Sequence, residues 1–270
     1  AAWEDILANM DSNTSIAQEI VESRDTDLQQ EHPRKHCRLE VNRAKPETQE
    51  VTKLSASNQL PSNIAQAKLI ETVTRPQRTH LVAWAKAHPH VIVLTADLTS
   101  SCEADLMRDT LPGQYLSLGM AEQNMMSFAG GLAREGYRPY IHTFGVFVTR
   151  RPFDQVAMSI GVPNLPVRML GFLPGLTTPG GVTHQAIDDV ALMRCIPNMH
   201  VLECGDATEV ESVLDVAEEI NGPVYIRMLR GEVPRLFPKS EPMKFGVPRL
   251  LSNGKDFTVV TAGICTEEAM

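Results

Sequence analysis

Glu122 is the residue whose position in this chain most clearly suggests chemistry. It lies within the octapeptide Gly119–Met126 (GMAEQNMM), after the strand-like segment 115–118 and at the start of an apolar helical segment rich in small residues. Open α/β sheets place their ligand chemistry where a strand ends and the next helix begins. A carboxyl group that is partly buried there can exchange a proton with a ligand. An acid at this spacing more often has a structural role, in which it complements the positive end of the helix dipole, than a role in proton exchange.

A histidine and two phenylalanines form the second group of candidates. His184 follows a Gly/Pro-rich loop in the segment GVTHQ (181–185) and precedes a predicted helix. A histidine in such a loop can donate, accept or shuttle a proton at a substrate hydroxyl. Phe144 and Phe147 stand in the run HTFGVF, where flat aromatic faces can stack on a planar ligand or simply pack in the core. His142 in the same run is a further candidate.

Short apolar strands alternate with helices from about residue 65 onward. Expected strands are 91–97, 114–118, 138–144, 165–172, 199–204 and 223–229, and expected helices are 66–73, 80–87, 100–111, 148–161, 186–196 and 207–222, besides the helix that begins at Glu122. This alternation predicts an α/β fold, with a parallel sheet flanked by helices and right-handed crossovers. Glu122 then lies at the carboxyl end of a strand of that sheet.

The two ends of the chain differ from this regular part. Residues 1–62 are polar and have few large apolar side chains to offset the entropy of ordering, so we interpret them as an arm or linker with one helix over 16–23. Near the other end, DFTVVTAG (256–263) is expected to be a buried strand. The expected organisation is an arm over 1–62, a main domain over 63–236, and a linker with the truncated start of a C-terminal α/β domain over 237–270.

Composition excludes several classes of protein. Of the 270 residues 43% are hydrophobic and 21% charged, and the formal net charge of −8 argues against nucleic-acid binding, which needs a basic face. The five cysteines are odd in number and scattered, which is typical of reduced thiols rather than of a disulfide framework or a zinc site. There is no run of about 18 apolar residues and no signal pattern, so we expect a cytoplasmic protein without a membrane partner.

Five blocks of sequence, in chain order, carry a resemblance to a known family. They are TADLTSS (95–101), GMAEQNMMSFAGGLAREGYRPYIHTFGVF (119–147), GGVTHQAIDD (180–189), ALMRCIPNMHVLECGDATEV (191–210) and YIRMLRGEVP (225–234). Over about residues 64–240 the chain resembles the pyrimidine-binding domain of transketolase, in the thiamine diphosphate family. The resemblance implies the parallel α/β fold of that domain and thiamine diphosphate as the cofactor.

The resemblance assigns roles to four residues on the cofactor side. Glu122 corresponds to the glutamate of the family's G-x-x-E-x-x-M segment, which protonates the aminopyrimidine ring so that the cofactor generates its own base. Phe147 corresponds to the aromatic residue that stacks on this ring, with Phe144 behind it. Asp97, in the ADLT turn, is expected to position the thiazolium end or the loop around it.

On the substrate side, the resemblance places His184 of the T-H-Q triplet at the donor end of the sugar. Arg75, Ser101 and Arg230 align with positions that hold the sugar phosphate. Guanidinium groups grip a phosphate through paired hydrogen bonds, which explains two arginines at one dianion. Arg78 is close enough in sequence to compete with Arg75 for this role.

Three positions depart from the family pattern. Arg150 stands where transketolases carry a further aromatic residue, so either the pyrimidine pocket is weakened or a different contact occurs there. Gly180 replaces an acid that reads a substrate hydroxyl, and Phe172 replaces a further family histidine. Because the last two changes lie on the sugar side, the resemblance implies that the thiamine chemistry is kept and leaves the sugar open.

The family holds the diphosphate through Mg²⁺ in a separate domain, with a G-D-G segment and a later asparagine. Here the CGDATE segment (204–209) lacks that asparagine, and we find no cluster of oxygen ligands suited to Mg²⁺. The resemblance therefore implies the C-terminal subunit of a split transketolase, whose partner is an N-terminal diphosphate-binding subunit that carries the Mg²⁺ ligands. We expect a dimer or heterotetramer that transfers a two-carbon ketol unit between phosphorylated sugars.

Three alternatives to a transketolase subunit stay open. Deoxyxylulose-phosphate synthase and the beta subunit of 2-oxoacid dehydrogenases share the A-E-Q segment, although the T-H-Q triplet and the TFGVF run favour transketolase. The third is a transketolase paralogue without catalytic activity. The substitutions at Arg150, Phe172 and Gly180 motivate it, since a fold can persist after its site has changed.

Overall fold

The computed structural model describes residues 70–270. The polar arm expected over residues 1–62, with its helix over 16–23, lies outside the described residues, and the expected division at residues 62 and 236 stays a prediction. Within the described part, strands and helices follow one another from residue 71 to residue 235, and one short helix, α9 (Cys265–Ala269), lies near the end.

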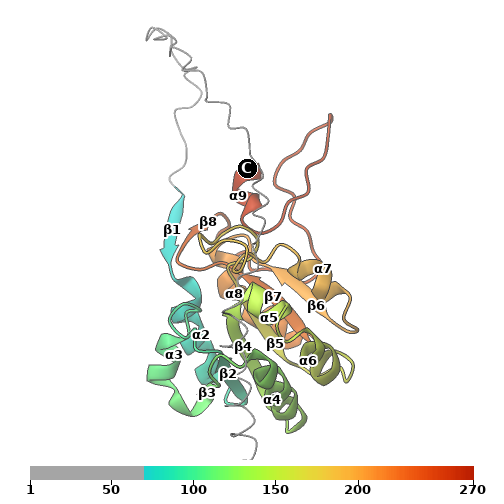
Figure 1. Cartoon of the computed structure of the whole chain (residues 1–270). Coiled ribbons are helices and arrows are strands. Elements are labelled where there is room, and N and C mark those ends of the chain that lie inside the picture. Colours follow the sequence, from blue (N-terminus) through green and yellow to red (C-terminus); the bar gives the residue numbers. More distant parts are fainter. Residues whose placement is uncertain (1–69) are drawn as a thin grey trace, which may run out of the picture. The chain divides into compact units, whose positions relative to one another are not determined.

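A six-stranded sheet forms the centre of the described part (Figure 1). Its strands are β2 (Val91–Thr95), β3 (Tyr115–Ser117), β4 (Arg138–Phe144), β5 (Arg168–Phe172), β6 (His200–Glu203) and β7 (Val224–Met228). They lie in the order β3-β2-β4-β5-β7-β6, and every neighbouring pair is parallel. The predicted parallel sheet is confirmed. Its central strands are apolar and buried along almost their whole length, as expected when helical crossovers cover both faces.

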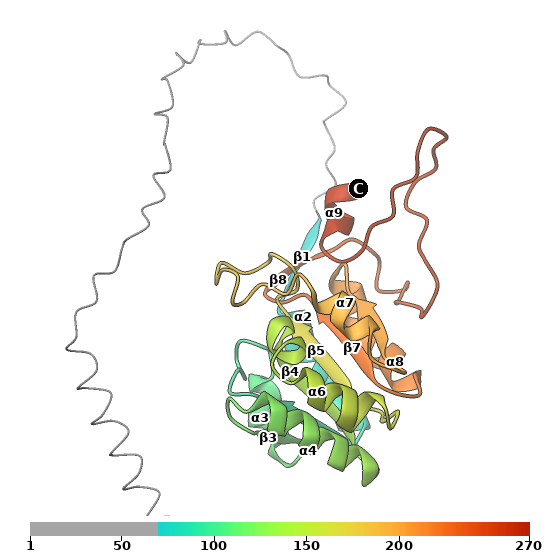
Figure 2. The same ribbon diagram turned by 45° about the vertical axis from the view of Figure 1, so that its right-hand side comes forward.

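Helices cover both faces of this sheet (Figures 1 and 2). They are α2 (Pro76–Ala87), α3 (Asp105–Thr110), η2 (Pro112–Gln114), α4 (Glu122–Arg134), α5 (Gly145–Thr149), α6 (Phe153–Gln155), the π-helical η3 (Val156–Gly161), α7 (Asp189–Arg194) and α8 (Ala207–Glu219). Helices α2 and α8 contribute Leu81 and Leu214 to one hydrophobic core. Helix α4 and η3 contribute Met126 and Ile160 to a second core on the other side. The predicted α/β architecture is therefore confirmed, with the sheet as the middle layer of three.

The helix expected over 66–73 is wrong in its described part. Glu71–Thr74 form strand β1, which pairs antiparallel with β8 (Glu232–Arg235) in a separate two-stranded ribbon. Three of the four residues of β1 are β-branched, which suits a strand better than a helix. Strand β8, which was not expected, contains Pro234, and proline is tolerated here since β8 has one neighbour only.

Two further expectations are corrected by the structure. The helix over 148–161 is interrupted between Thr149 and Phe153, where Pro152 cannot continue a helix. The strand over 256–263 is absent, and its side chains face solvent, with Phe257 81% and Val260 91% exposed. This segment has no partner strand among the described residues. Without a neighbouring strand its backbone N–H and C=O groups cannot form the hydrogen bonds of a sheet, so no strand forms.

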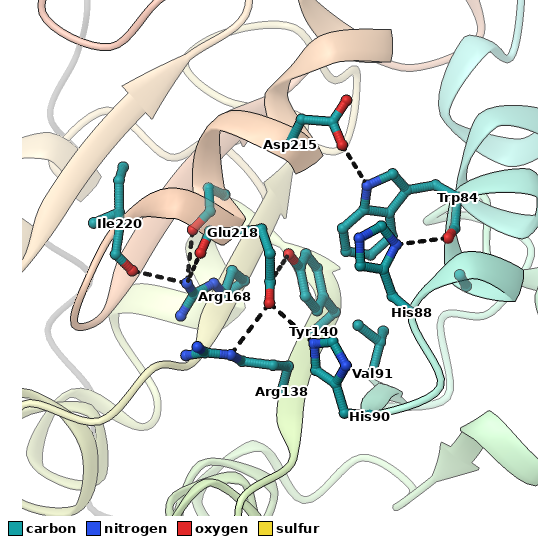
Figure 3. A network of polar contacts seen from close by, with 12 residues as sticks. Trp84, His88, His90, Val91, Arg138, Tyr140, Arg168, Asp215, Glu218 and Ile220 are labelled. Carbon is teal, nitrogen blue, oxygen red and sulfur yellow. Dashed lines mark hydrogen bonds and ion pairs between the residues drawn. The ribbon is translucent and has the colours of Figure 1, made fainter.

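A polar network closes the amino-terminal edge of the sheet (Figure 3). Glu218, in the last turn of α8, hydrogen-bonds to His90 Nε2 and Tyr140 Oη, both at 3.0 Å, and pairs with Arg138 Nε at 3.2 Å. The fully buried Arg168 donates to the carbonyl oxygens of residues 217 and 220 at 2.7 and 2.9 Å. It thereby adds hydrogen bonds to carbonyl groups at the helix end, where backbone donors are few. The network ties α8 to the first residues of β4 and β5.

Candidate active site

The candidate residues gather at the carboxyl ends of the parallel strands. Phe144 is the last residue of β4 and Phe147 lies in the following α5, while Glu122 begins the helix after β3. His184 lies in the long connection after β5, and Arg230 follows β7. Since ligands of open α/β sheets bind in the crevice at this edge, the fold brings residues distant in sequence to one place.

Glu122 and Phe147 are joined by Arg151, a residue that the sequence did not single out. Glu122 is 5% exposed, and its Oε1 accepts a hydrogen bond of 2.7 Å from Arg151. The same guanidinium lies 3.8 Å from the centroid of the Phe147 ring. The Arg151 side chain itself is half exposed, so it approaches the buried acid from solvent.

The two phenylalanines and His184 form an aromatic cluster. Phe144 and Phe147 stack with ring centroids 5.7 Å apart. The His184 ring meets both edge-on, at 5.3 Å from Phe147 and 6.2 Å from Phe144. Its Nδ1 lies 2.9 Å from the Thr183 hydroxyl. The histidine proposed for the substrate is therefore in contact with the aromatic pair proposed for the cofactor.

Arg150 makes polar contacts at the position where the resemblance leads us to expect an aromatic ring. Its Nε lies 3.1 and 3.0 Å from the two carboxylate oxygens of Asp188. Its terminal nitrogens donate to the carbonyl oxygens of Val182 and Gln185 at 3.4 and 3.3 Å. The departure noted in the sequence thus corresponds to a different contact, with the loop that carries His184.

The three residues expected to hold a phosphate also lie near one another. Arg230 donates to the Ser101 carbonyl at 2.8 Å and lies 5.9 Å from the Phe144 ring centroid. Arg75 donates to the Ser100 carbonyl and to Asp105, each at 2.9 Å. Arg75 and Arg230 line the same cleft, which has a volume of about 570 Å³. The competing Arg78 pairs with the other oxygen of Asp105.

Glu103 lines the same cleft and was not predicted from the sequence. It is 2% exposed and has a left-handed backbone, with φ of 56°. Its Oε1 accepts a hydrogen bond from the Gly231 backbone at 2.8 Å, and Oε2 is buried without a partner. Burial raises the pKa of Glu103 above its usual value, although the Gly231 hydrogen bond and the positive charge of Arg75 oppose this. The cleft therefore contains an acid beside its two arginines.

The other residues that the sequence singled out lie apart from these contacts. Asp97 is exposed in the turn after β2, with φ of 60°. His142 is fully buried, with Nδ1 3.0 Å from the Cys102 carbonyl, and its ring packs on Phe172 at 5.5 Å. Burial lowers the pKa of His142 to about 4, against the opposing effect of that hydrogen bond. His142 and Phe172 therefore belong to the core rather than to a substrate surface.

Gly180 has a steric explanation in this structure. A Cβ atom at this position would lie 2.9 Å from both Cβ and Cγ of His184. A side chain here would displace the histidine from its present position.

Two kinds of feature are absent from residues 70–270. No group of three or more His, Cys, Asp and Glu side chains in that range is placed to hold a metal ion. No helix in the same range is long and apolar enough to span a membrane.

The fold and site together define a class of protein: an open parallel α/β domain with a buried acid and an aromatic cluster at the carboxyl edge of its sheet. The chain belongs to the family described as "Transketolase, pyrimidine binding domain", whose profile matches residues 75–235. Membership of this family implies the use of thiamine diphosphate.

Comparison with individual proteins agrees with this family. The chain is 36% identical over 191 residues to a transketolase family protein of Sinorhizobium fredii, covering 70% of this chain and 55% of that protein. It is 35% identical over 191 residues to a 6-deoxy-6-sulfo-D-fructose transketolase subunit of Clostridium sp. (strain MSTE9), covering 70% and 59%. The chain thus spans little more than half the length of these curated relatives. A solved structure of a split-gene transketolase, described as an inactive β4 tetramer, is 38% identical with a TM-score of 0.65, covering 72% of this chain and 63% of that one.

Proposed function

We propose that this chain is the pyrimidine-binding subunit of a split transketolase, which transfers a two-carbon ketol unit between phosphorylated sugars. The observation that carries the proposal is the contact of Arg151 with both Glu122 and Phe147. The Arg151 guanidinium is a planar group with N–H donors. It lies 3.8 Å from the Phe147 ring centroid and donates to the Glu122 carboxylate at 2.7 Å. The aminopyrimidine ring of the cofactor is also flat and rich in nitrogen, so the pair offers the stacking face and the acid that this ring needs. The residues present fit the cofactor once the half-exposed Arg151 side chain moves off both groups.

Each residue of the cluster has a definite part in this proposal. Thiamine diphosphate, when bound, supplies a carbanion at C2 of its thiazolium ring. Glu122 would exchange a proton with the nitrogen of the aminopyrimidine ring, in a buried setting that strengthens the hydrogen bond. Phe147, backed by Phe144, would stack on that ring. Asp97, exposed in the turn after β2 and outside the cluster, would position the thiazolium end. His184 would hydrogen-bond to a hydroxyl of the sugar, since its ring lies at the edge of both phenylalanines.

The cleft between Arg75 and Arg230 is the proposed place of the sugar phosphate. Both guanidinium groups line it, and Ser101 is bonded to Arg230 through its carbonyl oxygen. Arginine forks suit the oxygens of a phosphate. Glu103 offsets part of their positive charge, so the net attraction for a dianion is weaker than two free arginines would give.

An N-terminal diphosphate-binding chain is the proposed partner, in a dimer or heterotetramer, and it would carry the ligands of Mg²⁺. One curated relative is itself described as a transketolase subunit, which supports this. The relative of known structure, a split-gene transketolase described as an inactive β4 tetramer, also supports it. By analogy, this chain would be inactive without its partner.

Reconstitution with a diphosphate-binding transketolase chain, thiamine diphosphate and Mg²⁺ tests the proposal, with ketol transfer between sugar phosphates as the readout. Glu122→Gln is expected to lower kcat by about 10²–10⁴-fold, because the amide cannot exchange the proton. Glu135→Gln, at the exposed end of the same helix, is the matched control and should keep full activity. Full activity of Glu122→Gln would remove Glu122 from its proposed role. Turnover by the chain alone would refute the split arrangement, and a reconstituted pair that binds no thiamine diphosphate would favour a paralogue without activity.

A further inference from the structure

The loop that carries His184 has little apolar anchoring. Its base is closed by a hydrogen bond of 2.8 Å from the Gly175 backbone N–H to the Ala186 carbonyl. The large apolar side chains in and beside the loop are 74%, 78% and 70% exposed: Leu176, Val182 and Ile187. The hydrogen bonds made within its tip, residues 177–185, are local. Within the tip only Thr178 is buried, so burial contributes little to fixing the tip, which depends on contacts from outside the loop.

Arg150 supplies the polar contacts, beside the ring contacts of His184 with Phe144 and Phe147. Across residues 70–270, every side-chain hydrogen bond that reaches the tip from outside the loop comes from Arg150, at the carbonyl oxygens of Val182 and Gln185. These two residues flank His184. The same guanidinium grips both oxygens of Asp188, at 3.1 and 3.0 Å from Nε. Asp188 directly precedes α7, but its side chain makes no capping hydrogen bond to that helix. Its carboxylate binds Arg150 instead.

Arg150 also fixes the loop relative to the aromatic cluster. It is the residue directly after α5, the five-residue helix that carries Phe147. A guanidinium fork holds several acceptors in one plane, which a single ammonium group cannot do. We infer that Arg150 is a positioning residue, which holds the His184 loop against Phe144 and Phe147. Its consequence for catalysis rests on the substrate role proposed for His184.

Hydrogen exchange of the purified full chain, measured by mass spectrometry, tests whether Arg150 holds the His184 loop. This experiment needs no enzyme assay. In Arg150→Ala, peptides covering 177–185 are expected to exchange about 5- to 30-fold faster, the factor that loss of one or two such hydrogen bonds gives in a local opening equilibrium. Peptides of β4 and β5 should be unchanged, which shows that the fold is kept. Arg108→Ala, which removes an exposed arginine paired with the adjacent Asp109, is the matched control and should leave the loop unchanged.

Asp188 provides a second variant from the other side of the contact. Asp188→Ala should also accelerate exchange in the loop, and the double variant with Arg150→Ala should add little, because both changes remove the same interaction. Wild-type exchange of the loop in both single variants would overturn the inference.

Kinetics of the reconstituted enzyme separate positioning from a general loss of structure. Arg150→Ala is expected to raise KM for the sugar about tenfold, while the thiamine diphosphate concentration for half-maximal activity changes less than about twofold. Arg150→Lys should give an intermediate KM, since one ammonium group can replace only part of the fork. An unchanged sugar KM together with weakened thiamine diphosphate binding would contradict the assignment. If the wild-type pair shows no ketol transfer, the proposed function fails, and hydrogen exchange still decides the position of Arg150.

Discussion

Replacing Glu218 with glutamine tests the network at the amino-terminal edge of the sheet (Figure 3). The Glu218 side chain is 19% exposed and contacts His90, Tyr140 and Arg138. Glutamine keeps the shape but loses the charge and one acceptor oxygen, so one of these donors loses its partner. A hydrogen bond to a charged group contributes about 1.5–3 kcal/mol, and we expect Glu218→Gln to lower the free energy of unfolding by about 2 kcal/mol. A fully exposed ion pair would contribute less than about 1 kcal/mol, so the larger loss expected for Glu218→Gln depends on the partial burial of Glu218.

The effect of this substitution depends on pH. Burial raises the pKa of Glu218, but the His90 and Tyr140 hydrogen bonds and the charges of Arg168 and Arg138 outweigh it, so the pKa is lower than usual. A carboxyl group whose pKa is lowered on folding adds stability that is complete above its unfolded pKa of about 4.3, and this stability is lost as pH falls through the folded pKa. The difference between wild type and Glu218→Gln should therefore be largest near neutral pH and shrink below about pH 4.

Urea unfolding followed by circular dichroism at pH 7 and in acid measures this difference. Glu219→Gln, the same substitution at the exposed neighbouring residue, is the control and should change stability by less than about 0.5 kcal/mol. If Glu218→Gln proves as stable as Glu219→Gln at pH 7, the network does not contribute as the distances suggest. A difference that persists unchanged in acid would refute the electrostatic explanation.

Three further predictions concern stability. A Cβ on Gly171 would lie 2.6 Å from Tyr225 Oη, so Gly171→Ala should lower the free energy of unfolding by about 1–3 kcal/mol, measured by thermal unfolding. At Gly131, inside α4, a Cβ would meet no atom within 4 Å. Gly131→Ala should therefore raise the free energy of unfolding by about 0.8 kcal/mol. Burial lowers the pKa of His142 to about 4, so NMR should show a neutral ring down to that pH. Stability should then fall between about pH 6.5 and pH 4 as the unfolded chain takes up the proton, and a ring that titrates near pH 6.5 in the folded protein would contradict this. Asp206 accepts three backbone hydrogen bonds, one at the start of α8 and two from the chain after β8, so Asp206→Ala should cost about 2–3 kcal/mol in urea unfolding and Asp206→Asn less.

The sequence predicts the central sheet well because its strands are short runs rich in apolar residues, bounded by turn residues. The strand expected over 138–144 agrees with β4 at both ends, since residues buried on both faces leave a strong signal. Strands β1 and β8 were missed because each exists only through the other, and Glu71 and Arg235 are far apart in the chain. The expected strand over 256–263 failed for the converse reason, since its apolar run has no partner among the described residues.

The candidate site could be predicted only where the resemblance supplied a position. Glu122, Phe147 and His184 were grouped in this way, and the structure brings all three into one connected cluster. Arg151 was missed because a single arginine between two helices gives no periodic signal. Arg150 was noticed as a departure, but its contact with Asp188 spans 38 residues and follows only from the fold. Pairing between side chains that are far apart in the sequence is thus the part of the candidate site that the residue pattern could not predict.

The two-stranded ribbon of β1 and β8 has a mechanical consequence. Glu71 faces Arg235, so the chain enters and leaves the ribbon at neighbouring points. A pulling force applied through these two points would load the ribbon's residue pairs one after another, beginning with Glu71 and Arg235, rather than all at once. Because Arg235 is also bonded to Thr208 and Glu211 of α8, the first step of opening must break those contacts as well. Neighbouring entry and exit points also make this domain a good candidate for circular permutation or for insertion into another protein.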